Sequence, residues 1–131
     1  MAIRVVRLGQ KREPGEGTRL GTVRRPPRGV RKSDFAKRDF YDVWVPDLAP
    51  SAQLLSWVKV EEMTDARWKR FEKEYRREMR ELGADRLIAL LAAMSRDLSF
   101  SVGCYCEDES RCHRRILAGL LEAAGAVLVR R

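Results

Sequence analysis

The chain has 131 residues, a length typical of one domain with one hydrophobic core. Its net charge is +8, because 27 Lys and Arg outnumber 19 Asp and Glu. No apolar run approaches the roughly 18 residues of a membrane span, and the N-terminus lacks the apolar stretch of a secretory signal. We therefore expect a cytoplasmic protein with no membrane partner, whose three cysteines are thiols or ligands and not a disulfide framework.

The excess positive charge is confined to the first quarter of the chain. Residues 1–32 hold ten basic and two acidic side chains, whereas residues 33–131 hold 17 of each sign. A cationic segment on a neutral body predicts an anionic partner.

The first third of the chain predicts little regular structure. Residues 3–8 are rich in β-branched side chains, which is typical of a strand. Residues 9–32 contain five Gly and three Pro without a helical period, so we expect a long basic loop with a short strand around 20–24. A helical turn capped by Ser33 is expected over 33–40, followed by extended backbone over 40–45.

The rest of the chain predicts helices that alternate with strands. In chain order we expect a helix over 52–59 capped by Ser51, a helix from Thr64 to 82, a helix from Asp85 to 94, a strand over 98–106, a helix capped by Ser110 or Asp108 and closed by Gly125, and a strand over 126–129. The stripe Trp68, Phe71 and Tyr75 is expected to be core packing. This order predicts an α/β fold, with residues 1–131 forming a single compact domain around a small, largely parallel sheet flanked by helices.

The densest reactive chemistry falls at the turn over residues 104–114 (CYCEDESRCHR), where a strand ends and a helix begins. Open α/β sheets bind ligands at such positions. Cys104 and Cys106 are two residues apart in a strand and share a face. Cys112 and His113 fall in the first helical turn, where the positive end of the helix dipole favours a thiolate at Cys112 and disfavours an imidazolium at His113.

Three interpretations of this turn stay open. Cys104, Cys106, Cys112 and His113 are a candidate zinc site, although their spacing is not the two-pair spacing of common zinc modules. The turn is alternatively an anion-binding or catalytic site, with Cys112 as nucleophile or His113 as acid or base. In the third interpretation Cys104 is a small core residue and the other side chains are unreactive.

Three motifs carry a family resemblance. They are residues 104–121 (CYCEDESRCHRRILAGLL), residues 44–55 (WVPDLAPSAQLL) and residues 24–30 (RRPPRGV). In this order they resemble the C-terminal motif, the W-x-P-x-L-A-P-S segment and the Asp-Arg-Leu-Trp-Pro-Arg-Gly stretch of the domain of unknown function 488 (DUF488) family, in its YeaO-like branch. The resemblance covers nearly the whole chain and implies a compact α/β fold, but it supplies no function.

Matched residue by residue, Arg24 corresponds to the family's first arginine, residues 27–29 to Pro-Arg-Gly and residues 112–114 to Cys-His-Arg. Val23 stands where the family has Asp. If the family's Asp holds the arginine that follows it, Arg24 is expected to be freer here. Pro26 stands where the family has Trp. The family that the chain resembles also includes members without these cysteines, which argues against an obligatory zinc site.

The basic loop has its own alternatives. Gly15, Gly17 and Gly21 superficially resemble a dinucleotide fingerprint, but the third glycine is one place late and no helix follows. The loop is better interpreted as a phosphate-binding arm, or as a solvated loop whose arginines pair with the acidic middle helices.

Our leading prediction combines the loop with the helix start. Arg24, Arg28, Arg111 and Arg114 are expected to bind an anionic, phosphate-bearing ligand, either a nucleotide or a nucleic acid. One alternative is a small enzyme that acts on a nucleotide-like substrate through a reactive His113 or Cys112, and the other is a zinc-stabilised structural protein.

Overall fold

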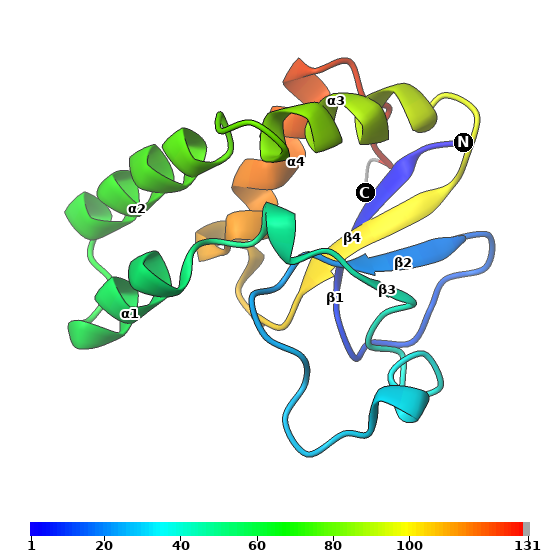
Figure 1. The fold of residues 1–131 in the computed structure, drawn as a ribbon, viewed down its shortest axis with the longest axis horizontal. Coiled ribbons are helices and arrows are strands. Elements are labelled where there is room, and N and C mark those ends of the chain that lie inside the picture. The colour runs from blue at the N-terminus through cyan, green and yellow to red at the C-terminus, as the bar shows by residue number, and fades with distance from the viewer. Residues whose placement is uncertain (130–131) are drawn as a thin grey trace.

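The computed structural model describes residues 1–129, in which a four-stranded sheet packs against helices (Figure 1). The strands are β1 (Ile3–Arg7), β2 (Thr18–Gly21), β3 (Val43–Trp44) and β4 (Phe100–Cys104). Their order across the sheet is β1-β4-β2-β3, and all three neighbouring pairs are parallel. The prediction of an α/β domain with a small, largely parallel sheet is confirmed.

Strand β4 lies in the interior of the sheet, because both of its edges are paired. Ile3 of β1 and Thr18 of β2 are both in register with Phe100. All five residues of β4 are buried, as is typical of parallel strands that are covered on both faces. Gly103 is required in this strand, because a Cβ there would lie 2.7 Å from the carbonyl oxygen of Val6.

The helices of the described chain are α1 (Ala52–Val60), α2 (Asp65–Glu78), α3 (Ala84–Met94) and α4 (His113–Ala123). Two begin as predicted: the hydroxyl of Ser51 accepts a hydrogen bond from the backbone of Leu54, and the hydroxyl of Thr64 accepts one from Arg67. Helices α1 and α2 lie side by side and extend away from the sheet (Figure 1). None of the helices in residues 1–129 has the length and apolar character to cross a membrane.

The starts of α3 and α4 differ from the prediction. Helix α3 begins after Gly83, which has a φ of 97°, so Asp85 lies inside the first turn and is not the cap. Helix α4 follows Cys112, whose side chain makes no capping hydrogen bond. Asp108 instead accepts hydrogen bonds from the backbone and the hydroxyl of Ser110. These two polar side chains therefore stabilise the turn before α4 and do not cap the helix.

The predicted extended segments are shorter in the structure. The strands expected around 20–24, over 40–45 and over 98–106 are the shorter strands β2, β3 and β4, and the strand expected over 126–129 is a single bridge between Leu128 and Ile3. The helical turn expected over 33–40 is a 3-10 turn at Lys32–Asp34, which starts after Arg31, so Ser33 does not cap it.

The main core lies between the sheet and helices α2, α3 and α4. Trp68 stacks on Phe71 with ring centroids 5.4 Å apart, and Phe71 on Tyr75 at 6.2 Å, so the aromatic stripe is core packing as predicted. A second, smaller group of buried side chains gathers near the carboxyl ends of the strands: Val6, Leu8, Val23, Tyr41, Cys104 and Cys112. Two of the three cysteines therefore belong to this second core.

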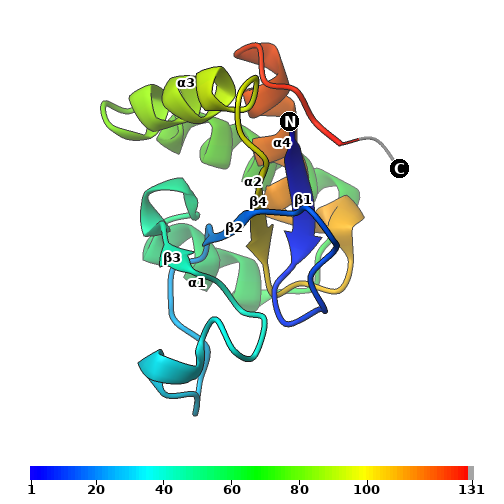
Figure 2. The same ribbon diagram turned by 90° about the vertical axis from the view of Figure 1, so that its right-hand side faces the viewer.

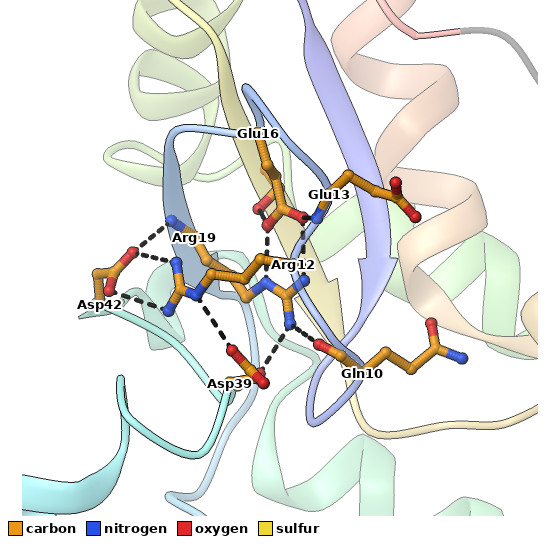
Figure 3. Close-up of polar contacts among 8 residues, drawn as sticks. Gln10, Arg12, Glu13, Glu16, Arg19, Asp39 and Asp42 are labelled. Carbon is orange, nitrogen blue, oxygen red and sulfur yellow. Dashed lines mark hydrogen bonds and ion pairs between the residues drawn. The ribbon is translucent and has the colours of Figure 1, made fainter.

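The basic loop contains a buried charge network (Figure 3). The guanidinium of Arg19 donates to both carboxylate oxygens of Glu16, at 2.7 and 3.0 Å, and both side chains are 1% exposed. Arg19 also donates to the backbone carbonyls of Gln10 and Asp39, and Glu16 accepts from the hydroxyl of Ser101 on β4. The network therefore ties the loop to the middle of the sheet.

Other arginines of the loop also find carboxylates nearby. Arg12 pairs with Asp42 at 2.7 Å, and Arg31 pairs with Asp34 at 3.2 Å. Together with Arg19, they pair within residues 12–42. The alternative in which the loop's arginines pair with the acidic middle helices is wrong for these three side chains.

Candidate functional site

A cavity of about 940 Å³ opens beyond the carboxyl ends of β2 and β4, beside the start of α4. The segment between β2 and β3, which forms part of its wall, extends on the opposite side of the molecule from α3 (Figure 1 and Figure 2). The cavity is lined by the loop 23–28, by Phe40, by Pro50 and the outer side of α1, and by residues 104–106 with His113. Its volume is typical of small-molecule sites.

The lining brings together part of the predicted site. Arg24, Arg28, Cys104, Cys106 and His113 all line the cavity, although they lie in distant parts of the chain. The lining residues include no Asp or Glu within the described chain. The predicted association of the basic loop with the cysteine turn is thus present as a shared cavity wall.

Arg24 anchors the loop to the start of α1. Its Nε donates to the carbonyl of Pro50 at 3.0 Å, and its Nη2 donates to those of Pro46 and Ala49 at 3.1 and 3.2 Å. The expectation that Arg24 is freer here, because Val23 replaces the family's Asp, is therefore wrong. Backbone carbonyls hold the guanidinium in place of a carboxylate.

The exposed cations of the cavity are Arg25, Arg28 and Lys59. Among the side chains that the structure describes, none forms an ion pair or a hydrogen bond with these three cations. The hydroxyl of Tyr105 donates to the carbonyl of Arg25 at 3.0 Å, and the Tyr105 ring packs edge-on against Phe40. The cavity thus combines unpaired positive charge with an aromatic wall.

The sulfur atoms of Cys104, Cys106 and Cys112 lie within 4.8 Å of one another. Cys104 ends β4, Cys106 follows two residues later, and Cys112 immediately precedes α4. Cys104 and Cys112 are 1% and 2% exposed, whereas Cys106 is exposed in the cavity. The three side chains are free thiols, so the cluster offers three soft ligand atoms.

Within this cluster the thiolate is favoured at Cys106. Hydrogen bonds from the thiols of Cys104 and Cys112, together with the positive charge of Arg114, lower the pKa of Cys106. The pKa of Cys112 is raised, because hydrogen bonds with the sulfurs of Cys104 and Cys106 favour its thiol form and because it is buried. The helix dipole predicted a thiolate at Cys112, but the two neighbouring sulfurs and the burial outweigh that field.

His113 is held by the backbone after β2. Its Nε2 lies 2.7 Å from the carbonyl oxygen of Thr22, which can only accept, so Nε2 carries the proton. Burial lowers the pKa of His113, which favours the neutral ring. Its Nδ1, which is then an acceptor, lies 3.9 Å from the sulfur of Cys112.

The two arginines predicted at the helix start lie outside the cavity lining. Arg114 is 4% exposed, and its Nη1 donates to the carbonyl of Cys106 at 2.7 Å. Arg111 forms an ion pair with Asp65 at the start of α2. Arg114 therefore braces the cysteine turn from behind, and Arg111 links that turn to α2.

Three further residues, Phe40, Lys59 and Tyr105, line the cavity but were not predicted from the sequence. Tyr105 lies between two cysteines already singled out, so its place in the motif was the available signal. Lys59 and Phe40 carry no local signal, because they reach the cavity only through the packing of α1 and of the segment before β3.

Comparison with known protein families gives a match over most of the chain. A family model described as the active DUF488-N3 subclade matches residues 3–125. A search of curated proteins and a search of solved structures each gave no match.

Proposed function

The chain belongs to the DUF488 family, as its motifs predicted, and we propose that it binds a phosphate-bearing ligand of nucleotide size in the cavity between residues 23–28 and 104–106. Its place in the YeaO-like branch of that family stays a prediction.

The observation that carries this proposal is the charge of the cavity wall. Arg24, Arg25, Arg28 and Lys59 converge on one cavity whose described lining holds no carboxylate. Guanidinium groups bind phosphate oxygens in a bidentate manner, and unpaired cations in a concave site attract anions. Arg28 is the member of the predicted set that is both exposed and unpaired within the described chain, so it is the foremost phosphate ligand.

The apolar part of the wall suits the remainder of a nucleotide. Phe40 and Tyr105 offer aromatic surface, and Pro26, Pro27 and Leu55 add aliphatic surface. Aromatic side chains stack on bases irrespective of sequence. Arg111 and Arg114, which do not line the cavity, have no direct contact with the ligand in this proposal.

The alternative of a reactive His113 or Cys112 gains no comparable support. Cys112 is 2% exposed and does not line the cavity. His113 lines the cavity but is only 8% exposed, and its protonated nitrogen is already bonded to Thr22. A nucleophile or a general acid has to reach its substrate within hydrogen-bond distance.

The test is a titration with two classes of ligand, nucleoside diphosphates and short single-stranded oligonucleotides, at several salt concentrations. We expect Arg28→Ala to weaken binding at least about ten-fold, since a hydrogen bond to a charged group contributes about 1.5–3 kcal/mol. Affinity should fall as salt rises, more steeply for an oligonucleotide that contacts more phosphates.

Arg31→Ala is the matched control. It removes the same charge from the same loop, but Arg31 is outside the cavity lining and pairs with Asp34. Its effect should stay below about two-fold. Equal losses in the two variants, or binding that ignores salt, would contradict the proposal.

A further inference from the structure

We propose that Cys104, Cys106 and Cys112 together bind a zinc ion through their sulfur atoms, at the wall of the cavity. The three sulfurs already lie within 4.8 Å of one another. A tetrahedral zinc with bonds of about 2.3 Å holds its sulfurs about 3.8 Å apart, so side-chain adjustments of about 1 Å suffice. This inference does not depend on the proposed binding of a phosphate.

The strongest independent support is the buried cation beside the cluster. Arg114 is 4% exposed, and its Nη1 lies 3.7 Å from the sulfur of Cys104. Its Nε is buried without a hydrogen-bond partner, and no carboxylate of the described chain forms an ion pair with it. A buried guanidinium is stabilised by a negative charge near it, and the sulfur of Cys104 is a group beside it that can carry one. Three thiolates around Zn²⁺ carry a net charge of about −1, which supplies that negative charge.

The donors that surround the sulfurs fit a bound thiolate. The backbone N–H of Cys106 points to the sulfur of Cys104 at 3.4 Å, and the guanidinium of Arg114 approaches the same atom. Arg114 also holds the backbone of this turn through the carbonyl of Cys106. Such outer contacts orient metal ligands and are important for metal affinity.

The fourth coordination position faces the cavity. Cys104 and Cys106 both line the cavity, and the side chain of Cys106 is exposed there. His113, which was predicted among the ligands, is not a member of the three-sulfur group. Three protein ligands with one open position leave room for water or for a donor atom of a ligand in the cavity.

The experiment is a metal titration of the full chain under reducing, oxygen-free conditions, with Zn²⁺ and with Co²⁺ as a spectroscopic probe. We expect one equivalent of either metal to bind, and Co²⁺ to show sulfur-to-metal charge transfer together with the visible bands of a tetrahedral site. Cys106→Ser should weaken binding at least about ten-fold, and this exposed position allows the variant to fold.

Ser56→Ala is the matched control, because Ser56 lines the same cavity and has no thiol. It should bind Co²⁺ as the unaltered chain does. Less than about a tenth of an equivalent bound, an octahedral Co²⁺ spectrum, or equal affinity in the folded Cys106→Ser variant would overturn the zinc site. Because no anion takes part in the titration, such a result would leave the phosphate proposal standing, and loss of nucleotide binding in Arg28→Ala would leave the zinc site standing.

Discussion

The pair formed by Glu16 and Arg19 shows how a single carboxylate links stability to pH. Burial alone would raise the pKa of Glu16, but hydrogen bonds from Arg19 and Ser101 outweigh it and lower the pKa to about 2. The usual value is 4.5. A carboxylate with a lowered pKa stabilises the fold above its unfolded-state pKa, so this contribution is lost as the pH falls from about 4.5 toward 2.

Glu16→Gln tests this pair. The variant keeps the side-chain volume but leaves Arg19 buried without its carboxylate, which should cost about 3–5 kcal/mol of unfolding free energy at pH 7. The variant should also lose less stability than the unaltered chain between pH 4.5 and 2. Urea unfolding at both ends of that range measures both effects. Glu13→Gln, at a neighbouring exposed position, is the control and should change stability by less than about 0.5 kcal/mol. If Glu16→Gln and the unaltered chain lost the same stability between pH 4.5 and 2, the lowered pKa of Glu16 would be refuted.

Residue roles of this kind were only partly predictable. The cysteines drew attention because their residue type and spacing are themselves chemical signals. Glu16 and Arg19 gave none, because they are three residues apart in a loop without periodicity and meet through the fold of residues 10–42. The charge count therefore predicted a segment of free cations. In the structure Arg12, Arg19 and Arg31 are each paired with a carboxylate.

The N-cap residues of α1 and α2 differ in the hydrogen bonds that they make beyond their own helix. The hydroxyl of Thr64 caps α2 alone. The hydroxyl of Ser51 caps α1 and also donates to Glu78 at the end of α2, and the backbone N–H of Ser51 donates to the same carboxylate at 2.8 Å. Ser51 therefore joins two helices in addition to starting one.

Replacing each cap by alanine tests this difference. Thr64→Ala should lower the free energy of unfolding by about 1 kcal/mol, the usual value of an N-cap. Ser51→Ala should cost about 2 kcal/mol, since it also removes a hydrogen bond to a partly buried carboxylate. Chemical denaturation gives both values. A loss for Thr64→Ala that equals or exceeds that of Ser51→Ala would show that the contact with Glu78 adds nothing.

Helices were easier to predict than strands because their signals are local. Thr64 and the aromatic stripe of α2 lie within one segment, and the cap and the period agree. Strand β3 has only two residues, and its existence depends on β2, more than 20 residues away in the chain. The sequence therefore indicated extended backbone there without fixing which residues pair.

The cavity is a property of the whole molecule, because its walls come from distant segments of the chain: the loop before β3, helix α1, and the cysteine turn with His113. A few hydrogen bonds join these segments. Arg24 joins the loop to α1, Tyr105 bonds to the carbonyl of Arg25, and His113 bonds to that of Thr22. The hypothesis of a bound anion placed the loop and the cysteine turn in one site. Which arginines anchor the wall and which face the ligand depends on carbonyls far along the chain, so no pattern in the sequence could separate them.

Arg24→Ala and Arg25→Ala separate these two roles. Arg24→Ala removes three hydrogen bonds to the carbonyls of Pro46, Ala49 and Pro50, and should cost about 2–3 kcal/mol of stability. Hydrogen exchange of residues 22–29 should become faster in this variant, because the loop loses its anchor. Arg25→Ala removes an exposed guanidinium that has no partner within the described chain, so stability should change by less than about 0.5 kcal/mol while nucleotide binding weakens.

Thermal unfolding, hydrogen exchange and ligand titration of both variants check this division. An anchoring arginine affects binding through stability, whereas a ligand-facing arginine affects binding alone. Because each variant removes one arginine at neighbouring positions, the net charge is the same in both and cannot produce a difference between them. Equal losses of stability in Arg24→Ala and Arg25→Ala would mean that the carbonyl contacts of Arg24 do not hold the cavity wall in place.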